Sequence, residues 1–117
     1  MSEIVRIGAG KRWSDVVVYG GVARWVEVAE NADDDARGQI EQVLRQIVQT
    51  AAGLGVDRRA LLEVVIYLAD LRDAPSLNEL WDAWVVPGQA PIRACVGAQL
   101  GGGLRIEVIV QAAVAGG

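Results

Sequence analysis

The sequence predicts an α+β domain in which one mixed six-stranded sheet carries two helices on one face. Six short segments rich in valine and isoleucine have the character of strands, and two longer segments place apolar residues at helical spacing. Their order along the chain is β-β-β-α-β-α-β-β, and helices that occur at intervals among strands pack against one sheet. The length of 117 residues suits one domain, which we take as residues 1–117.

The first thirty residues predict three antiparallel strands. Residues 3–7 and 15–19 form short β-like segments, and residues 22–29 form a third. Gly20-Gly21 separates the second segment from the third and is a strong signal for a tight hairpin turn. We therefore expect at least one hairpin in this part of the sheet.

The acidic residues 31–35 are suited to the start of a helix, which Gly53 and Gly55 would end. Apolar residues recur on one face of this helix: Ile40, Val43, Leu44, Ile47, Val48 and Ala51. Glutamines and charged residues fall elsewhere on it: Gln39, Glu41, Gln42, Arg45, Gln46 and Gln49. The pattern predicts one face packed on the sheet.

The second half of the chain predicts a strand at residues 62–68 and a second helix that begins after residues 70–73. The apolar face of this helix has helical spacing and consists of Leu77, Leu80, Trp81, Trp84 and Val85, and Pro87-Gly88 ends it. Two further strands begin at Pro91 and Arg105, with Gly101-Gly102-Gly103 between them.

One face of the predicted sheet should remain uncovered, because two helices on one side cannot bury all of its apolar residues. We assign Val16, Val18, Val65, Val108 and Val110 to this surplus. An acidic domain with an apolar open sheet face is expected to oligomerise. We therefore predict an oligomer with clefts where subunits meet.

The composition excludes several classes of function. The chain has no histidine, which removes His-ligated metal sites and serine or cysteine nucleophiles paired with histidine. Its net charge of −4, with a single lysine, makes it a poor nucleic-acid binder. No segment has the length of a membrane span, and the N-terminus does not resemble a signal peptide. A single cysteine is consistent with the reducing cytoplasm.

Arg93 and Glu107 lie in apolar strands, where an unpaired charge is costly. A guanidinium binds a carboxylate bidentately, and a carboxylate can activate a water. Arg93 and Cys95 are two apart on one strand and share a face. Whether Arg93 and Glu107 belong to one cleft depends on strand order. The structural alternative pairs Arg93 with Glu27 or Glu107, or Glu107 with Arg105.

Several motifs resemble the Rid family (RidA/YjgF-like reactive intermediate deaminases). The most specific is Pro91-x-Arg93-x-Cys95-Val96 followed by Ile106-Glu107-Val108, and Asn78-Glu79-x-Trp81 resembles a second family motif. Residues 12–17 and 81–85 resemble the YoaB-like branch. The resemblance implies a chorismate-mutase-like fold and a homotrimer with three clefts between subunits.

The resemblance also implies an activity without metal or cofactor: hydrolysis of 2-imino acids, such as 2-iminopropanoate and 2-iminobutanoate, to 2-keto acids and ammonia. Arg93 would bind the substrate carboxylate, Glu107 would position or activate the water, and Cys95 would line the cleft as a small residue rather than a nucleophile.

Trp13, Ser14 and Glu27 would complete the substrate site, and two of them depart from the family pattern. Trp13 replaces a tyrosine that many members have before Ser14, and Glu27 replaces a glycine in the third strand. A glycine allows close backbone approach, whereas a glutamate fills that space and adds negative charge. Three functions therefore stay open: an imine hydrolase, a non-catalytic protein that binds a small carboxylate, and a hydrolase for a cationic or larger imine.

Overall fold

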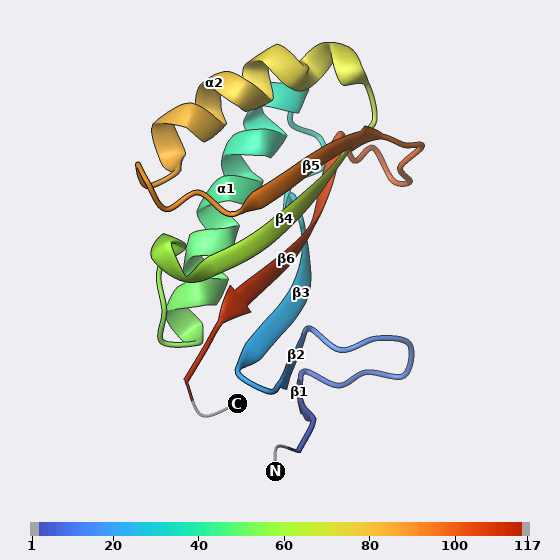
Figure 1. Ribbon diagram of the computed structural model, residues 1–117. Helices are drawn as coiled ribbons and strands as arrows, with labels where there is room; N and C mark the ends of the chain where they lie inside the picture. The colour runs from blue at the N-terminus through green and yellow to red at the C-terminus, as the bar shows by residue number, and fades with distance from the viewer. Residues whose placement is uncertain (1–2, 116–117) are drawn as a thin grey trace.

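Two helices cover one face of a six-stranded sheet in the computed structural model, which describes residues 3–115 (Figure 1). The predicted order of elements is confirmed. The strands are β1 (Val5–Ile7), β2 (Val16–Tyr19), β3 (Val22–Val28), β4 (Leu61–Leu68), β5 (Ile92–Gly97) and β6 (Ile106–Ala113). The helices are α1 (Ala36–Gly53) and α2 (Ala74–Trp84), and short 3-10 turns, η1 (Arg58–Ala60) and η2 (Leu71–Asp73), precede β4 and α2.

The strand order is β1-β2-β3-β6-β4-β5. β4 and β5 are parallel and all other neighbours are antiparallel, so the sheet is mixed as predicted. The last strand, β6, lies between β3 and β4 and joins the N-terminal hairpin to the rest of the sheet. The Gly20-Gly21 turn has φ of 59° and 78°, the left-handed values that a two-residue hairpin turn requires.

The core lies between the helices and the sheet. Ile40, Val43 and Ile47 on α1 are fully buried, and Leu77 and Trp81 on α2 are buried beside them. Among residues 3–115, no helix is long and apolar enough to cross a membrane.

The residues that we expected on the uncovered sheet face need correction. Val16, Val108 and Val110 are buried under the helices, and Val18 packs against this core. The open face is apolar, as expected, and of the five predicted residues Val65 does lie on it, beside Tyr67. The other residues that form it are Val26, Val96 and Ile109, which are 53%, 46% and 37% exposed. A strand presents two alternating sets of side chains, and these valine-rich strands are apolar in both.

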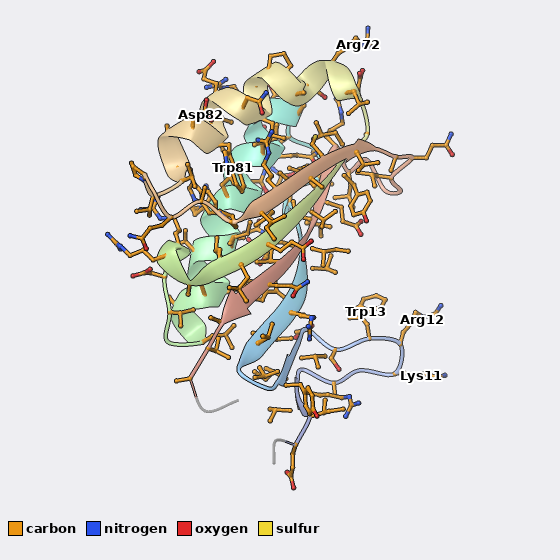
Figure 2. All side chains as sticks on the ribbon, viewed as in Figure 1. Lys11, Arg12, Trp13, Arg72, Trp81 and Asp82 are labelled. Atoms are coloured by element: carbon orange, nitrogen blue, oxygen red, sulfur yellow. The ribbon has the colours of Figure 1, made fainter. Side chains whose placement is uncertain are left out.

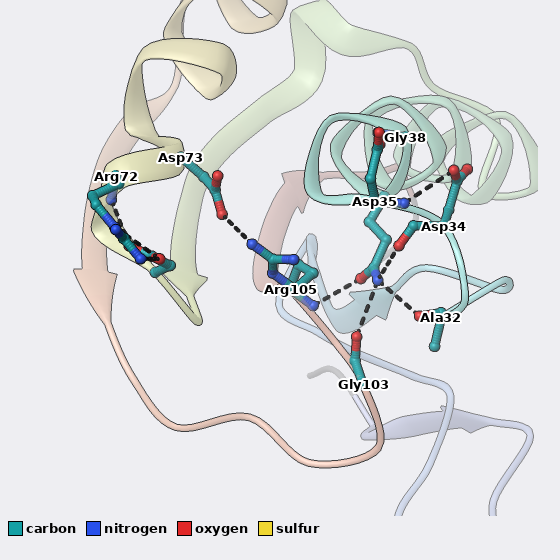
Figure 3. Close-up of polar contacts among 10 residues, drawn as sticks. Ala32, Asp34, Asp35, Gly38, Arg72, Asp73, Gly103 and Arg105 are labelled. Carbon is teal, nitrogen blue, oxygen red and sulfur yellow. Dashed lines mark hydrogen bonds and ion pairs between the residues drawn. The ribbon is translucent and has the colours of Figure 1, made fainter.

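Three glutamines of α1 are buried, although the sequence placed them off its apolar face. Gln39, Gln42 and Gln46 are at most 7% exposed and bind the chain that connects β3 to α1. Gln39 Nε2 lies 3.0–3.1 Å from the carbonyl oxygens of Ala32, Asp34 and Gly103, and its Oε1 accepts a 2.8 Å hydrogen bond from the Arg105 N–H (Figure 3). Buried amides are tolerated when their hydrogen bonds are satisfied in this way.

Charged pairs surround the start of α2. Arg105 binds Asp73 at 3.1 Å, which ties the start of β6 to this helix (Figure 3). The side chain of Asp70 accepts hydrogen bonds from the side chain and the N–H of Arg72, and these lower its pKa from 3.8 to about 2. Asp70 therefore caps the short turn η2 rather than α2 itself.

Candidate functional site

A cleft lies beside the end of β3, where β2 no longer pairs with it. β2 begins at Val16, which pairs with Trp25, so the last three residues of β3 have no strand partner on that side. The connection of residues 8–15 stands next to this open edge. Ten residues line the cavity of about 740 Å³: Trp13, Ser14, Asp15, Val16, Trp25, Val26, Glu27, Val28, Thr50 and Glu107. Its size suits a small-molecule ligand.

The β1–β2 connection is folded so that Trp13 reaches the cleft. The Gly10 N–H donates to the carbonyl of Trp13 at 2.8 Å, and the Asp15 N–H donates to the carbonyl of Ile7 at 3.0 Å. Gly8 has a φ of +63°, and a Cβ there would lie 2.1 Å from the Asp15 carboxylate. The Trp13 side chain is 71% exposed, an unusual state for so large an apolar group (Figure 2).

Glu27 extends from β3 toward α1 and is held by three donors of its own chain. Its Oε2 accepts hydrogen bonds from Trp25 Nε1 at 2.8 Å and Thr50 Oγ1 at 2.9 Å. Its Oε1 receives only a long contact of 3.4 Å from Gln46 Nε2. All three donors are neutral, so the carboxylate is fixed in position while its charge is not paired.

Glu107 lies on β6, opposite Val28 on β3 and Tyr67 on β4. Its side chain is half-buried and faces the open side of the sheet. No hydrogen bond or ion pair joins the Glu107 side chain to any residue between 3 and 115. The alternative that Glu107 pairs with Arg105 does not hold in this chain, because Arg105 binds Asp73.

Arg93 and Cys95 lie away from the cleft, on the edge strand β5. They align with Val64 and Ile66 of β4, which places both on the helix face. Arg93 donates to Asn78 Oδ1 at 2.9 Å, and its guanidinium lies 5.3 Å from the centre of the Trp81 ring. Cys95 packs against the core.

Arg93 and Glu107 therefore do not meet within one chain. They are on opposite faces of the sheet, and β4 separates their strands. Trp13, Ser14, Glu27 and Glu107 all line the cleft at the edge of β3, where Glu27 lies on the helix face of the sheet and Glu107 on the open face, whereas Arg93 and Cys95 do not line it.

Two polar residues of the cleft, Asp15 and Thr50, were missed by sequence reasoning. We used Asp15 only as part of a predicted strand and of a segment with family resemblance, although a carboxylate next to Trp13 and Ser14 was a usable signal. Thr50 gave no signal, since a threonine near the end of a helix has no distinguishing pattern. The described part of the chain contains no group of three or more His, Cys, Asp or Glu placed to hold a metal ion.

The fold defines the class of protein. Two helices on one face of this mixed six-stranded sheet form the chorismate-mutase-like α+β fold, here with a carboxylate-lined cleft at the open edge of β3. A Rid-family protein from Yersinia pestis shares this fold at 18% identity, with a TM-score of 0.83.

Sequence comparison then gives the family. The profile described as Endoribonuclease L-PSP matches residues 5–114. The chain is 41% identical over 112 residues to the RutC family protein YoaB of Escherichia coli (strain K12), which covers 95% of this chain and 98% of that protein. It is 34% identical to a RutC family protein of Haemophilus ducreyi, over 95% of this chain and 97% of that protein. NMB1025 of Neisseria meningitidis, a member of the YjgF protein family, superposes with a TM-score of 0.89 at 36% identity and 98% coverage of both chains. The chain belongs to the YjgF/Rid family, as its motifs predicted.

Proposed function

We propose that this protein is a Rid-type hydrolase that converts 2-imino acids to 2-keto acids and ammonia. The observation that carries the proposal is Glu107, a half-buried carboxylate that lines a cleft without an ion-pair or hydrogen-bond partner between residues 3 and 115. A carboxylate left free in a cleft is suited to act as a general base. We further propose that the enzyme acts in the cytoplasm.

Glu107 can serve the proton transfers of this reaction, starting from the protonated imine. It would accept a proton from a water whose oxygen bonds to C2, giving a carbinolamine, and would return this proton to the nitrogen. As the C2–N bond breaks and the carbonyl forms, Glu107 would accept the hydroxyl proton and pass it to the departing ammonia, which leaves as ammonium. The step consumes one water and needs no oxidant or reductant.

The substrate carboxylate needs a cation that the cleft of one chain lacks, because no lysine or arginine lines it in the described structure. Arg93 is suited to this role: it is exposed on the edge strand β5, and Asn78 and Trp81 hold its guanidinium in position. We propose a homotrimer in which Arg93 and Cys95 of one subunit face the cleft of the next. The apolar open face of the sheet supports such an assembly.

The test uses 2-iminobutanoate produced in situ by a pyridoxal-phosphate dehydratase, with 2-ketobutyrate formation followed by absorbance. We expect wild type to accelerate the reaction. Arg93→Ala and Glu107→Gln should each lower the rate of imine hydrolysis by at least about 100-fold, the lower range for loss of a general base. Arg72→Ala removes an exposed arginine whose one ion-pair partner among residues 3–115 is Asp70, and it should keep the wild-type rate. No acceleration by wild type refutes the proposal.

A non-catalytic binding protein is the second candidate, favoured by one observation: Glu27 occupies the cleft and is held by three donors. Such a protein would bind 2-ketobutyrate through Arg93 without turning over the imine. Calorimetric binding by wild type but not by Arg93→Ala, together with no turnover, would favour it.

We do not propose ribonuclease activity, despite the description of the family profile. The cleft is lined by Asp15, Glu27 and Glu107, which repel a phosphate backbone, and the net charge is −4.

A further inference from the structure

The acids that line the cleft form no ion pair within residues 3–115. Five ion pairs occur between residues 3 and 115, and their acidic partners all lie elsewhere: Glu41, Asp57, Asp70, Asp73 and Glu79. Asp15, Glu27 and Glu107 line the cleft, and none of them takes part in a pair. The chain has ten arginines and one lysine, so suitable cations were available.

Nearby cations do not neutralise the cleft within one chain. Lys11 and Arg12 lie on the same connection as Trp13, but they project from its outer part, away from the sheet (Figure 2). Neither residue lines the cleft.

The network around Glu27 prepares one oxygen atom for a ligand. Oε2 is satisfied by Trp25 and Thr50 at 2.8 and 2.9 Å, which fixes the carboxylate in one orientation. A carboxylate has about four acceptor positions, and Oε1 uses one of them in a long 3.4 Å contact with Gln46. Oε1 can therefore accept further hydrogen bonds from a charged donor at little cost in rearrangement.

The Trp13 indole adds a second feature that suits a cation. It lines the same cavity, it is 71% exposed, and the face of an indole attracts ammonium and guanidinium groups. The cavity of about 740 Å³ in one chain exceeds the need of a three- or four-carbon acid.

We propose that the cleft selects 2-imino acids whose side chain ends in an ammonium or guanidinium group, with Glu27 and Trp13 receiving that cation. The inference rests on the proposed function, in which Arg93 of a neighbouring subunit binds the substrate carboxylate. One arginine against three carboxylates leaves the assembled cleft with a net charge of −2, and a cationic side chain reduces this imbalance, which a neutral one does not.

The experiment compares imines that differ in charge but hardly in shape. A broad-specificity amino-acid oxidase with catalase generates the imines of arginine and of citrulline, its neutral near-isostere, at matched rates. Semicarbazide traps free imine, so hydrolysis by the protein appears as a slower formation of semicarbazone. We expect wild type to hydrolyse the arginine imine about tenfold faster than the citrulline imine, the ratio of one modest charge–charge contact.

Glu27→Gln keeps the shape of the side chain and removes its charge, so it should bring the two rates to within about twofold of each other. Glu41→Gln removes the same charge from an exposed position on α1 outside the cleft, and it should keep the tenfold preference. Equal wild-type rates for both imines, or an unchanged preference in Glu27→Gln, would overturn the inference while leaving the proposed function intact. Failure with every imine, 2-iminobutanoate included, would instead refute the proposed function.

Discussion

Mixing two inactive variants should restore activity, because Arg93 and Glu107 of one chain cannot reach the same ligand. The two residues lie on opposite faces of the sheet with β4 between their strands. If each cleft combines Glu107 of one subunit with Arg93 of the next, a chain that lacks Arg93 can still supply Glu107, and the reverse holds for its partner.

The activity recovered by the mixture follows from the contribution of one residue by each of two chains. Arg93→Ala and Glu107→Gln chains are unfolded together in equal amounts and refolded, so that they assemble at random. One half of the clefts then belong to a chain with Glu107, and one half of those face a chain with Arg93. We expect about one quarter of the wild-type rate with 2-iminobutanoate, whatever the number of subunits, since each site involves two chains.

The controls separate complementation from other causes. Arg93→Ala mixed with the double variant Arg93→Ala/Glu107→Gln should stay inactive, because no chain supplies the arginine. Differently tagged chains recovered in one assembly show that mixing occurred. A mixed assembly with no activity above the single variants would refute the shared site, because both residues would then have to act from one chain.

Three further predictions concern stability and assembly. Gln39→Leu should lower the free energy of unfolding, measured in urea at fixed protein concentration, by about 3 kcal/mol, since three buried hydrogen bonds of about 1 kcal/mol each are lost. The control Gln49→Leu, on the exposed side of α1, should change this free energy by less than about 0.5 kcal/mol, and a loss below about 1 kcal/mol for Gln39→Leu would contradict the role of the buried amide. The pKa of Asp70 is lowered to about 2, so its contribution to folding stability is complete above pH 3.8 and is lost as the pH falls toward 2. The thermal midpoint of Asp70→Asn should therefore depend less on pH between 4 and 2 than that of wild type, and an equal pH dependence of the two midpoints would contradict this contribution. Ile109→Glu places a charge on the open sheet face and should yield monomers in light scattering, while Ala83→Glu on the exposed side of α2 should not; an Ile109→Glu oligomer would show that this face is not the interface.

The order of elements could be predicted from the sequence because it depends on local patterns. The spacing of Ile40, Val43 and Ile47 identifies a helix face wherever that helix packs, and Gly20-Gly21 identifies a turn from its own backbone preferences. These signals require no knowledge of distant contacts.

The faces of the strands could not be predicted, because they depend on pairing between distant segments. Val108 and Ile109 are both apolar neighbours on β6, and only the register with β3 and β4 decides that Val108 is buried and Ile109 exposed. The strand register also decides that Arg93 and Glu107 lie on opposite faces of the sheet. The motif that contains both residues places them close in sequence order, whereas the sheet places them on opposite faces.

The buried glutamines link this limit to the site. One polar stripe of α1 has spacings of three and four residues and consists of Gln39, Gln42, Gln46 and Thr50. From sequence alone, a polar stripe on a helix is predicted to face solvent. Here the connection of residues 29–35 folds over the stripe and supplies backbone partners for its first members. Its last two members, Gln46 and Thr50, hold Glu27 in the cleft, and Gln46 also accepts a hydrogen bond from the Glu30 N–H of this connection. Gln46 also donates to the carbonyl of Val28, so one side chain both anchors the end of β3 and orients the carboxylate beside it. The orientation of Glu27 is therefore a consequence of how α1 packs on the sheet, and substitutions within the stripe should change substrate preference and stability together.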